Sequence, residues 1–155
     1  MTADKKTAFK KELHQLAIEI IRKRSAEAKQ AMENAQAAAN SEEKSSAGDK
    51  YETSRAMSQL EKDMHAKQLA ANNQELSALL AINCEKLYDI VAIGSVVVCN
   101  ELSFFIACGL GKISVGATDI YFLSPTAPVA KLLYNKVAGD TISFNNRQLT
   151  IQELY

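Results

Sequence analysis

The sequence predicts an α+β protein in which an antiparallel helical hairpin of coiled-coil type precedes a small antiparallel β-domain with one short helix. Two observations predict it. The first 93 residues contain one glycine, Gly48, and no proline, whereas the other five glycines and both prolines come later. Residues 1–80 hold 25 charged side chains and residues 81–155 hold 11. We therefore expect a helical hairpin over residues 1–81 and a β-domain over residues 82–155.

The first helix is expected over residues 7–40, which are rich in Ala, Glu, Lys, Gln and Leu. These residues lose little on entering a helix. Apolar positions recur mostly at three- and four-residue steps, as on one face of a helix: Phe9, Leu13, Leu16, Ile20, Ala28, Ala31, Ala35 and Ala38,.

The second helix is expected over residues 50–81, which have the same composition. Its apolar stripe consists of Met57, Leu60, Met64, Ala71 and Ala78, and it is flanked by Leu69, Leu76 and Leu80. We expect the two stripes to meet in a two-stranded seam. At about 1.5 Å per residue, each helix would be on the order of 50 Å long.

The turn of the hairpin is expected between Ser41 and Asp49, in a stretch rich in Ser, Gly and Asp,. Acidic side chains gather around it: Glu42, Glu43, Asp49 and Glu52. One interpretation is structural, because Asp49 and Glu52 have the spacing of an acidic capping box. The other is that these carboxylates are presented to a metal ion or a basic channel in a partner. No residues of this chain complete a metal site, so we expect no cofactor and assign any Mg²⁺ to the partner.

Six short β-branched and aromatic runs, separated by Gly, Asn and Pro, predict the strands of the β-domain. They are residues 96–98, 104–106, 113–115, 120–123, 141–144 and 149–151.

The segment between the fourth and fifth runs predicts a strand that ends at Ser124, followed by a short helix. Ser124 is expected to cap this helix, whose early turns tolerate Pro125 and Pro128. Its buried side is expected to carry Val129, Leu132 and Leu133. A turn at Gly139 and Asp140 and a tight hairpin at Asn145 and Asn146 complete the domain.

Charge and cysteine usage exclude several classes of protein. The 18 basic and 18 acidic residues balance, which disfavours direct DNA binding and attachment to a membrane surface,. No stretch approaches the roughly 20 apolar residues of a membrane span. Cys84, Cys99 and Cys108 have no metal-site spacing, so we expect reduced, buried thiols in a cytoplasmic protein,.

The C-terminal part resembles the Gre family of bacterial transcript-cleavage factors. In that family a strand leads into a Ser-Pro-x-(Ala/Ser)-Pro-like turn, a short helix and the pattern Lys-x-x-Gly-Asp before the next strand. The residues that fit the pattern, and which we expect to define the fold, are Ser124, Pro128, Lys136, Gly139 and Asp140. The segment Gly94-Ser95-Val96 resembles the opening of the family's domain, and in the hairpin the resemblance rests on residues 48–52 and Arg55.

The resemblance implies an FKBP-like domain that docks on RNA polymerase at the mouth of its secondary channel. It also implies a coiled coil that enters the channel and places acids beside the catalytic Mg²⁺, near the nascent RNA. Such a protein is not itself an enzyme, because it stimulates RNA cleavage by the polymerase. The FKBP-like fold leaves a prolyl isomerase as a remote alternative, but fold is not function.

The acids at the tip depart from the family's pattern, in which Asp-x-x-Glu-Asn precedes a Tyr that begins the second helix. Counting back from Tyr51, the two acid positions here are Lys44 and Ala47. Asp49 and Glu52 keep the three-residue spacing but lie on either side of Tyr51. Two functions therefore remain open: a cleavage factor, and a non-cleaving regulator or interaction protein whose hairpin meets this or another partner.

Overall fold

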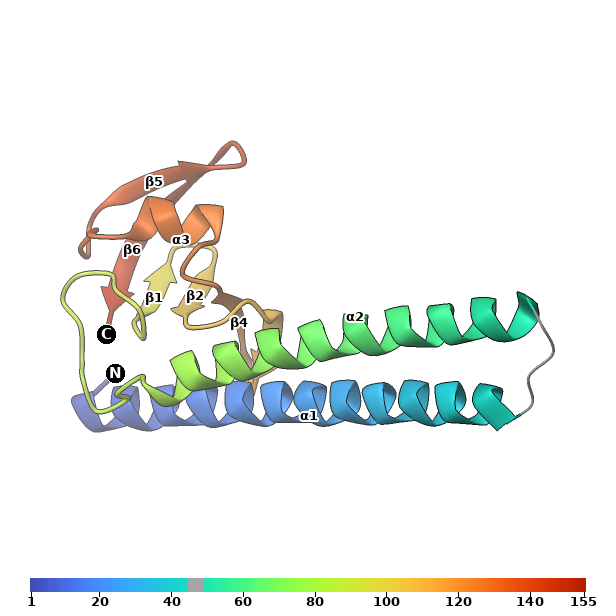
Figure 1. Ribbon diagram of the computed structural model, residues 1–155. Coiled ribbons are helices and arrows are strands. Elements are labelled where there is room, and N and C mark those ends of the chain that lie inside the picture. Colours follow the sequence, from blue (N-terminus) through green and yellow to red (C-terminus); the bar gives the residue numbers. More distant parts are fainter. Residues whose placement is uncertain (45–48) are drawn as a thin grey trace. The chain divides into compact units, whose positions relative to one another are not determined.

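The computed structural model describes the backbone of residues 1–44 and 49–155 and the side chains of residues 1–41 and 52–155. Two long helices come first, α1 (Ala3–Lys44) and α2 (Asp49–Leu80). Strands and one short helix follow (Figure 1): β1 (Val96–Cys99), β2 (Ser103–Ile106), β3 (Gly111–Val115), β4 (Thr118–Leu123), α3 (Pro128–Leu133), β5 (Thr141–Phe144) and β6 (Arg147–Leu154). The expected α+β class is confirmed, and a strand lies at each predicted run.

Helix α1 is longer at both ends than predicted. It begins at Ala3, where Thr2 Oγ1 accepts a hydrogen bond from the backbone amide of Lys5 at 3.3 Å,. At its other end, residues 41–44 are helical and do not belong to the turn, since Glu and Lys are good helix formers,. Of the predicted turn, residues 45–48 lie outside the described part of the chain.

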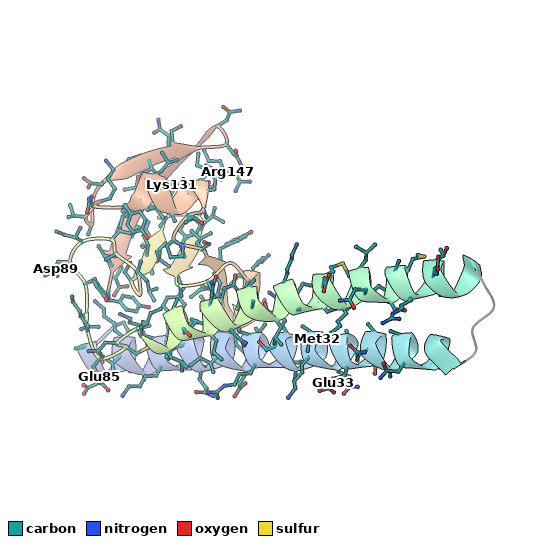
Figure 2. All side chains as sticks on the ribbon, in the orientation of Figure 1. Met32, Glu33, Glu85, Asp89, Lys131 and Arg147 are labelled. Carbon is teal, nitrogen blue, oxygen red and sulfur yellow. The ribbon has the colours of Figure 1, made fainter. Side chains whose placement is uncertain are left out.

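The side of α2 that packs against α1 is marked by half-buried positions at three- and four-residue steps (Figure 1). These positions are Ser58, Lys62, His65, Leu69, Asn72 and Leu76, followed by the fully buried Leu79. Across this seam Lys62 Nζ donates a hydrogen bond to Gln36 Oε1 of α1 at 2.6 Å. On α1, Ala28 and Ala35 are buried, as predicted. Figure 2 shows Met32 on the side of α1 that faces α2.

The predicted seam stripe of α2 is wrong, because all five of its residues, Ala71 and Ala78 included, are exposed. Met57, Leu60 and Met64 expose 59%, 69% and 50% of their surface and lie on the side away from the seam. Helix α2 has apolar residues on two sides, and a single partner helix can cover only one of them. The side that carries Leu69 and Leu76 takes the seam.

The six strands form one sheet in the order β3-β4-β2-β1-β6-β5. Neighbouring strands are antiparallel except for β2 and β4, which run parallel with Phe104 opposite Tyr121. The expectation of a purely antiparallel sheet is therefore corrected. After β2 the chain passes through a loop to β3 at the sheet edge, and the β3–β4 hairpin returns β4 to the free side of β2.

The core of the sheet joins residues from several strands with one side of α3. Its buried members include Val97, Phe104, Ile106, Val129, Ala130, Leu133, Ile142, Leu149 and Ile151. Helix α3 thus buries Ala130, whereas Leu132, expected in the core, is 42% exposed. The reason is that α3 begins at Pro128 and is only six residues long, so it offers a single narrow buried side.

The contacts of the chain group it into two compact units. The base unit comprises Met1–Ile18 and Ala78–Tyr155, and the arm comprises Glu19–Ser77. The start of α1 therefore belongs with the strands. There Lys6 Nζ lies 3.1 Å from Glu153 Oε1 and 5.2 Å from the ring centre of Tyr155. That residues 1–81 and 82–155 are separate domains stays a prediction.

Candidate functional site

The acids predicted at the tip are only partly described. The side chains of Glu42, Glu43 and Asp49 lie outside the described residues. Glu52 is exposed and lines a shallow hollow together with Arg55, Ala56 and Gln59. Among the residues that the structure describes, no three or more His, Cys, Asp or Glu side chains are grouped so that they could hold a metal ion. Whether the tip carboxylates converge therefore stays a prediction.

A groove of about 600 Å³ in the base unit is a concave surface of the size that ligand and partner sites have,. Its lining comes from β2, β4, β5, β6, the start of α3 and the segments beside them: Leu102, Phe104, Tyr121, Leu123, Ala127, Pro128, Val129, Phe144, Asn145, Arg147 and Leu149. Most of these side chains are apolar. The rings of Phe104 and Tyr121 form part of the wall, with centroids 6.1 Å apart and planes inclined by 46°.

Polar groups line the groove on the β5–β6 hairpin. Asn145 and Asn146 have φ angles of 50° and 61°, so both residues are in the left-handed region required by a tight two-residue turn,. The predicted hairpin is therefore confirmed, with Phe144 opposite Arg147. The Arg147 guanidinium lies 3.7 Å from Glu101 Oε2, and both side chains are more than half exposed. The groove thus combines an apolar lining with a solvent-accessible cation.

The segment that carries the family resemblance leads into one wall of this groove. Ser124 does not cap α3, which corrects the expectation. Its Oγ accepts a hydrogen bond from the amide of Thr126 at 3.3 Å, and its carbonyl accepts one from the amide of Ala127 at 3.0 Å. These bonds form a turn between β4 and α3. Ala127 occupies the N-cap position without a side-chain bond, and Pro128 begins the helix, where a missing amide hydrogen costs little,.

Lys136, Gly139 and Asp140 lie after α3, in the connection to β5. The carbonyl of Lys136 accepts a hydrogen bond from the amide of Val91 at 2.9 Å, and the amide of Gly139 donates to the carbonyl of Ile151 at 2.8 Å. Asp140 Oδ2 accepts from the amide of Val137 at 2.9 Å. Gly139 has a φ of 96°, a conformation that glycine adopts without strain,. The contacts of these three residues are backbone and turn contacts, and none of the three lines the groove.

A buried basic cluster in the base unit was not predicted from the sequence. Lys10 is fully buried, and its Nζ donates a hydrogen bond to the carbonyl of Lys86 at 2.7 Å. Lys10 Nζ also lies 4.6 Å from the ring centre of Tyr88, and Lys86 Nζ lies 4.9 Å from the same ring,. One turn along α1, His14 Nε2 donates to the carbonyl of Leu79 at 2.5 Å. Desolvation by burial lowers the pKa of Lys10 from 10.5 to about 8,.

This cluster ties the first turns of α1 to the segment that follows α2. Lys11 and Glu85 form an ion pair beside it. The sequence did not indicate this cluster, because the ammonium group of a lysine on the apolar side of a helix usually extends into solvent. Here the helix is covered by a distant segment of the chain, and that segment supplies the carbonyl acceptor.

The three cysteines are buried, and none of them forms a disulfide bond. Desolvation raises the pKa of Cys99 to about 11 and also raises the pKa of Cys84. Buried thiols with raised pKa values are poor nucleophiles. They pack as small apolar side chains, with Cys99 in the core of the sheet.

A second hollow, of about 510 Å³, lies within the arm between α1 and α2. Its walls are Arg24, Glu27, Ala28 and Ala31 of α1 and His65, Gln68, Ala71 and Asn72 of α2. It is shallow and open to solvent, and alanines on both helices leave this space. It therefore reflects loose packing of the seam more than a built site.

Comparison with known proteins yields no match for this chain among protein-family models, curated proteins or solved structures. In the part of the chain that the structure describes, no helix is both long enough and apolar enough to cross a membrane.

Proposed function

We propose that this protein is a Gre-like factor that binds RNA polymerase through its base unit and inserts its arm into the secondary channel. The observation that carries the proposal is the combination of two parts in one chain. Helices of 42 and 32 residues, with an acidic sequence where they meet, precede a six-stranded sheet. The residues that resemble the family occupy the turn before α3 and the turn before β5. The chain is then a binding factor that acts on the polymerase and not an enzyme in its own right.

The groove is the docking surface in this proposal. It offers exposed parts of Leu102, Tyr121, Leu123 and Phe144, all of them half-buried, to an apolar side chain of the partner. Burial of such side chains is the main source of affinity at protein interfaces, and a central apolar pocket is typical of binding hot spots. Arg147 supplies a cation for an acidic group of the polymerase,.

The arm acts by occupying the channel, and its acids decide whether it also assists catalysis. Two carboxylates beside a polymerase-held Mg²⁺ would help to hold a second metal ion and orient a water for attack on a phosphodiester. Asp49 and Glu52, one helical turn apart, are the best-placed pair. Because these acids lie on either side of Tyr51 instead of preceding it, we favour a channel-occupying regulator over a cleavage factor.

Capture of purified bacterial core polymerase by the tagged full-length protein tests this function. Arg147→Glu reverses a charge in the groove and is expected to weaken capture by about tenfold, since a charge pair at an interface becomes a repulsion. Lys131→Glu is the matched control: Lys131 is an exposed cation of α3 outside the groove lining (Figure 2). No capture of polymerase by the unaltered protein would refute the proposal. Equal loss in both variants would refute docking through the groove.

A transcript-cleavage assay on stalled polymerase separates the two mechanisms. A cleavage factor would stimulate RNA shortening, and Asp49→Ala combined with Glu52→Ala would abolish the stimulation while binding persists. A regulator would bind and change elongation without stimulated cleavage, which is the outcome we expect. Catalysed cis/trans isomerisation of a proline-containing peptide by the unaltered protein, with no capture of polymerase, would instead favour the alternative function, that of a prolyl isomerase.

A further inference from the structure

Helix α2 carries an unpartnered apolar stripe on the side away from the seam. This outer stripe consists of Met57, Leu60 and Met64, spaced three and four residues apart so that they lie on one face,. Each exposes half or more of its surface. Single exposed apolar side chains are normal, but three contiguous large ones on one helical face indicate an interaction surface.

Acidic side chains border the outer stripe. At about 100° per residue, Glu61 lies on the flank of Met57 and Met64, and Glu52 and Asp63 lie on the opposite flank, that of Leu60. All three are exposed. Lys67 lies on the same flank as Asp63, one turn beyond Met64, so three carboxylates and one ammonium group border the stripe,. The face therefore combines an apolar centre with negative edges.

The negative edges determine which partner fits. Nucleic acid and anionic lipid surfaces carry phosphates that the flanking carboxylates would repel. A second copy of the chain would set Glu61 and Asp63 near the same acids of its partner. A protein helix with apolar side chains between Lys or Arg residues complements both features.

We propose that the outer stripe is a docking surface for a basic amphipathic helix of a partner protein. The partner's apolar side chains pack on Leu60 and the two methionines, whose flexible thioethers adapt to different shapes. Its Lys and Arg side chains pair with Glu52, Glu61 and Asp63. This site is independent of the groove in the base unit and does not require the polymerase proposal.

Fluorescence anisotropy with the full-length protein and a labelled probe peptide tests the site. The probe is a helical peptide of about five turns, with Leu on one face and Lys at its borders, and its matched control has Glu in place of Lys. We expect the Lys peptide to bind and the Glu peptide not to bind. Leu60→Ser is expected to weaken binding about tenfold, whereas Leu132→Ser, the same change at an exposed leucine of α3, leaves it unchanged.

The charge requirement is tested in the same assay with the double variant Glu61→Gln and Asp63→Asn. We expect weaker binding of the Lys peptide and a smaller dependence on salt concentration. The proposal is overturned if the two peptides bind equally, or if Leu132→Ser weakens binding as much as Leu60→Ser. It is also overturned if sedimentation shows a dimer that Leu60→Ser dissociates, because a second copy would then occupy the stripe.

Discussion

Lys10 and Lys86 are joined by a hydrogen bond of 2.7 Å from the ammonium group of the first to the carbonyl oxygen of the second. The two residues are separated by the whole of the arm in sequence. Their ammonium groups lie against the same Tyr88 ring. This contact makes the first turns of α1 part of the base unit. Because the ammonium group of Lys10 is buried, the free energy of unfolding should depend on pH.

Stability should rise with pH because of Lys10. Its pKa is about 8 in the folded protein and near 10.5 when solvated, so between these values the unfolded chain binds more protons. Folding then becomes more favourable as the pH increases through this window. We compare the protein with its Lys10→Met variant, both in a Cys84→Ala background so that the neighbouring thiol does not titrate. In urea unfolding between pH 7.5 and about 10.5, the free energy of unfolding of the protein with Lys10 should increase with pH relative to that of the Lys10→Met variant. A difference that is constant with pH would refute the burial of a charged Lys10.

The base unit should need the first residues of α1. Residues 82–155 alone would expose Tyr155, which the structure leaves 2% exposed, and would leave Glu153 without Lys6. We expect a variant that lacks residues 19–77, with a short glycine linker in their place, to unfold cooperatively at close to the melting temperature of the full chain. The fragment 82–155 should melt at a lower temperature or fail to fold. Equal melting of the two would show that the β-domain is self-sufficient.

The seam of the hairpin is tested by placing the same charge once inside it and once on the outer side of α2. Ala35→Asp introduces a carboxylate at a position that is 5% exposed and should cost several kcal/mol of the arm's stability, because the charge is buried without a partner,. Leu60→Asp lies on the outer stripe and should cost less than about 0.5 kcal/mol. Circular dichroism during urea unfolding measures both. A large loss for Leu60→Asp with little for Ala35→Asp would mean that the seam lies on the other side of α2.

The cysteines should resist alkylation in the folded protein. Cys84, Cys99 and Cys108 are each less than a tenth exposed, and burial holds the pKa of Cys99 at about 11. At pH 8 we expect iodoacetamide to modify them at the rate of global or local opening and to modify all three quickly in denaturant. Mass spectrometry counts the labels. Rapid labelling of one thiol in the folded protein would contradict the burial of that cysteine.

Local sequence signals predicted the strands well, because each strand is a β-branched or aromatic run between turn residues such as Asn145 and Asn146. Such local signals do not determine which strands pair or which side of a helix packs. The parallel pairing of β2 with β4 depends on which sheet edge is free when β4 arrives. The side of α2 that packs was mistaken because Met57 and Leu60 are as apolar as Leu69 and Leu76, and only the partner helix distinguishes them.

The candidate sites likewise include residues that act locally, which the sequence indicated, and residues that the fold brings together, which it did not. The turn residues of the family pattern, such as Gly139 and Asp140, were visible in the sequence because they act locally. The groove was not, since it joins residues as distant as Leu102 and Arg147. The burial of Lys10 also escaped prediction, because lysine is rarely buried and its acceptor lies 76 residues away,.

Photo-crosslinking from the arm tests most directly whether the arm enters the secondary channel of RNA polymerase. A crosslinking residue at position 52 of the full-length protein, mixed with a stalled polymerase complex, is predicted to react with the polymerase subunits that line the secondary channel. The same residue at position 89, an exposed loop position of the base unit (Figure 2), should not reach the channel lining. Crosslinks to the channel from position 52 alone would support insertion of the arm. Their absence from position 52, in a complex that otherwise forms, would contradict it.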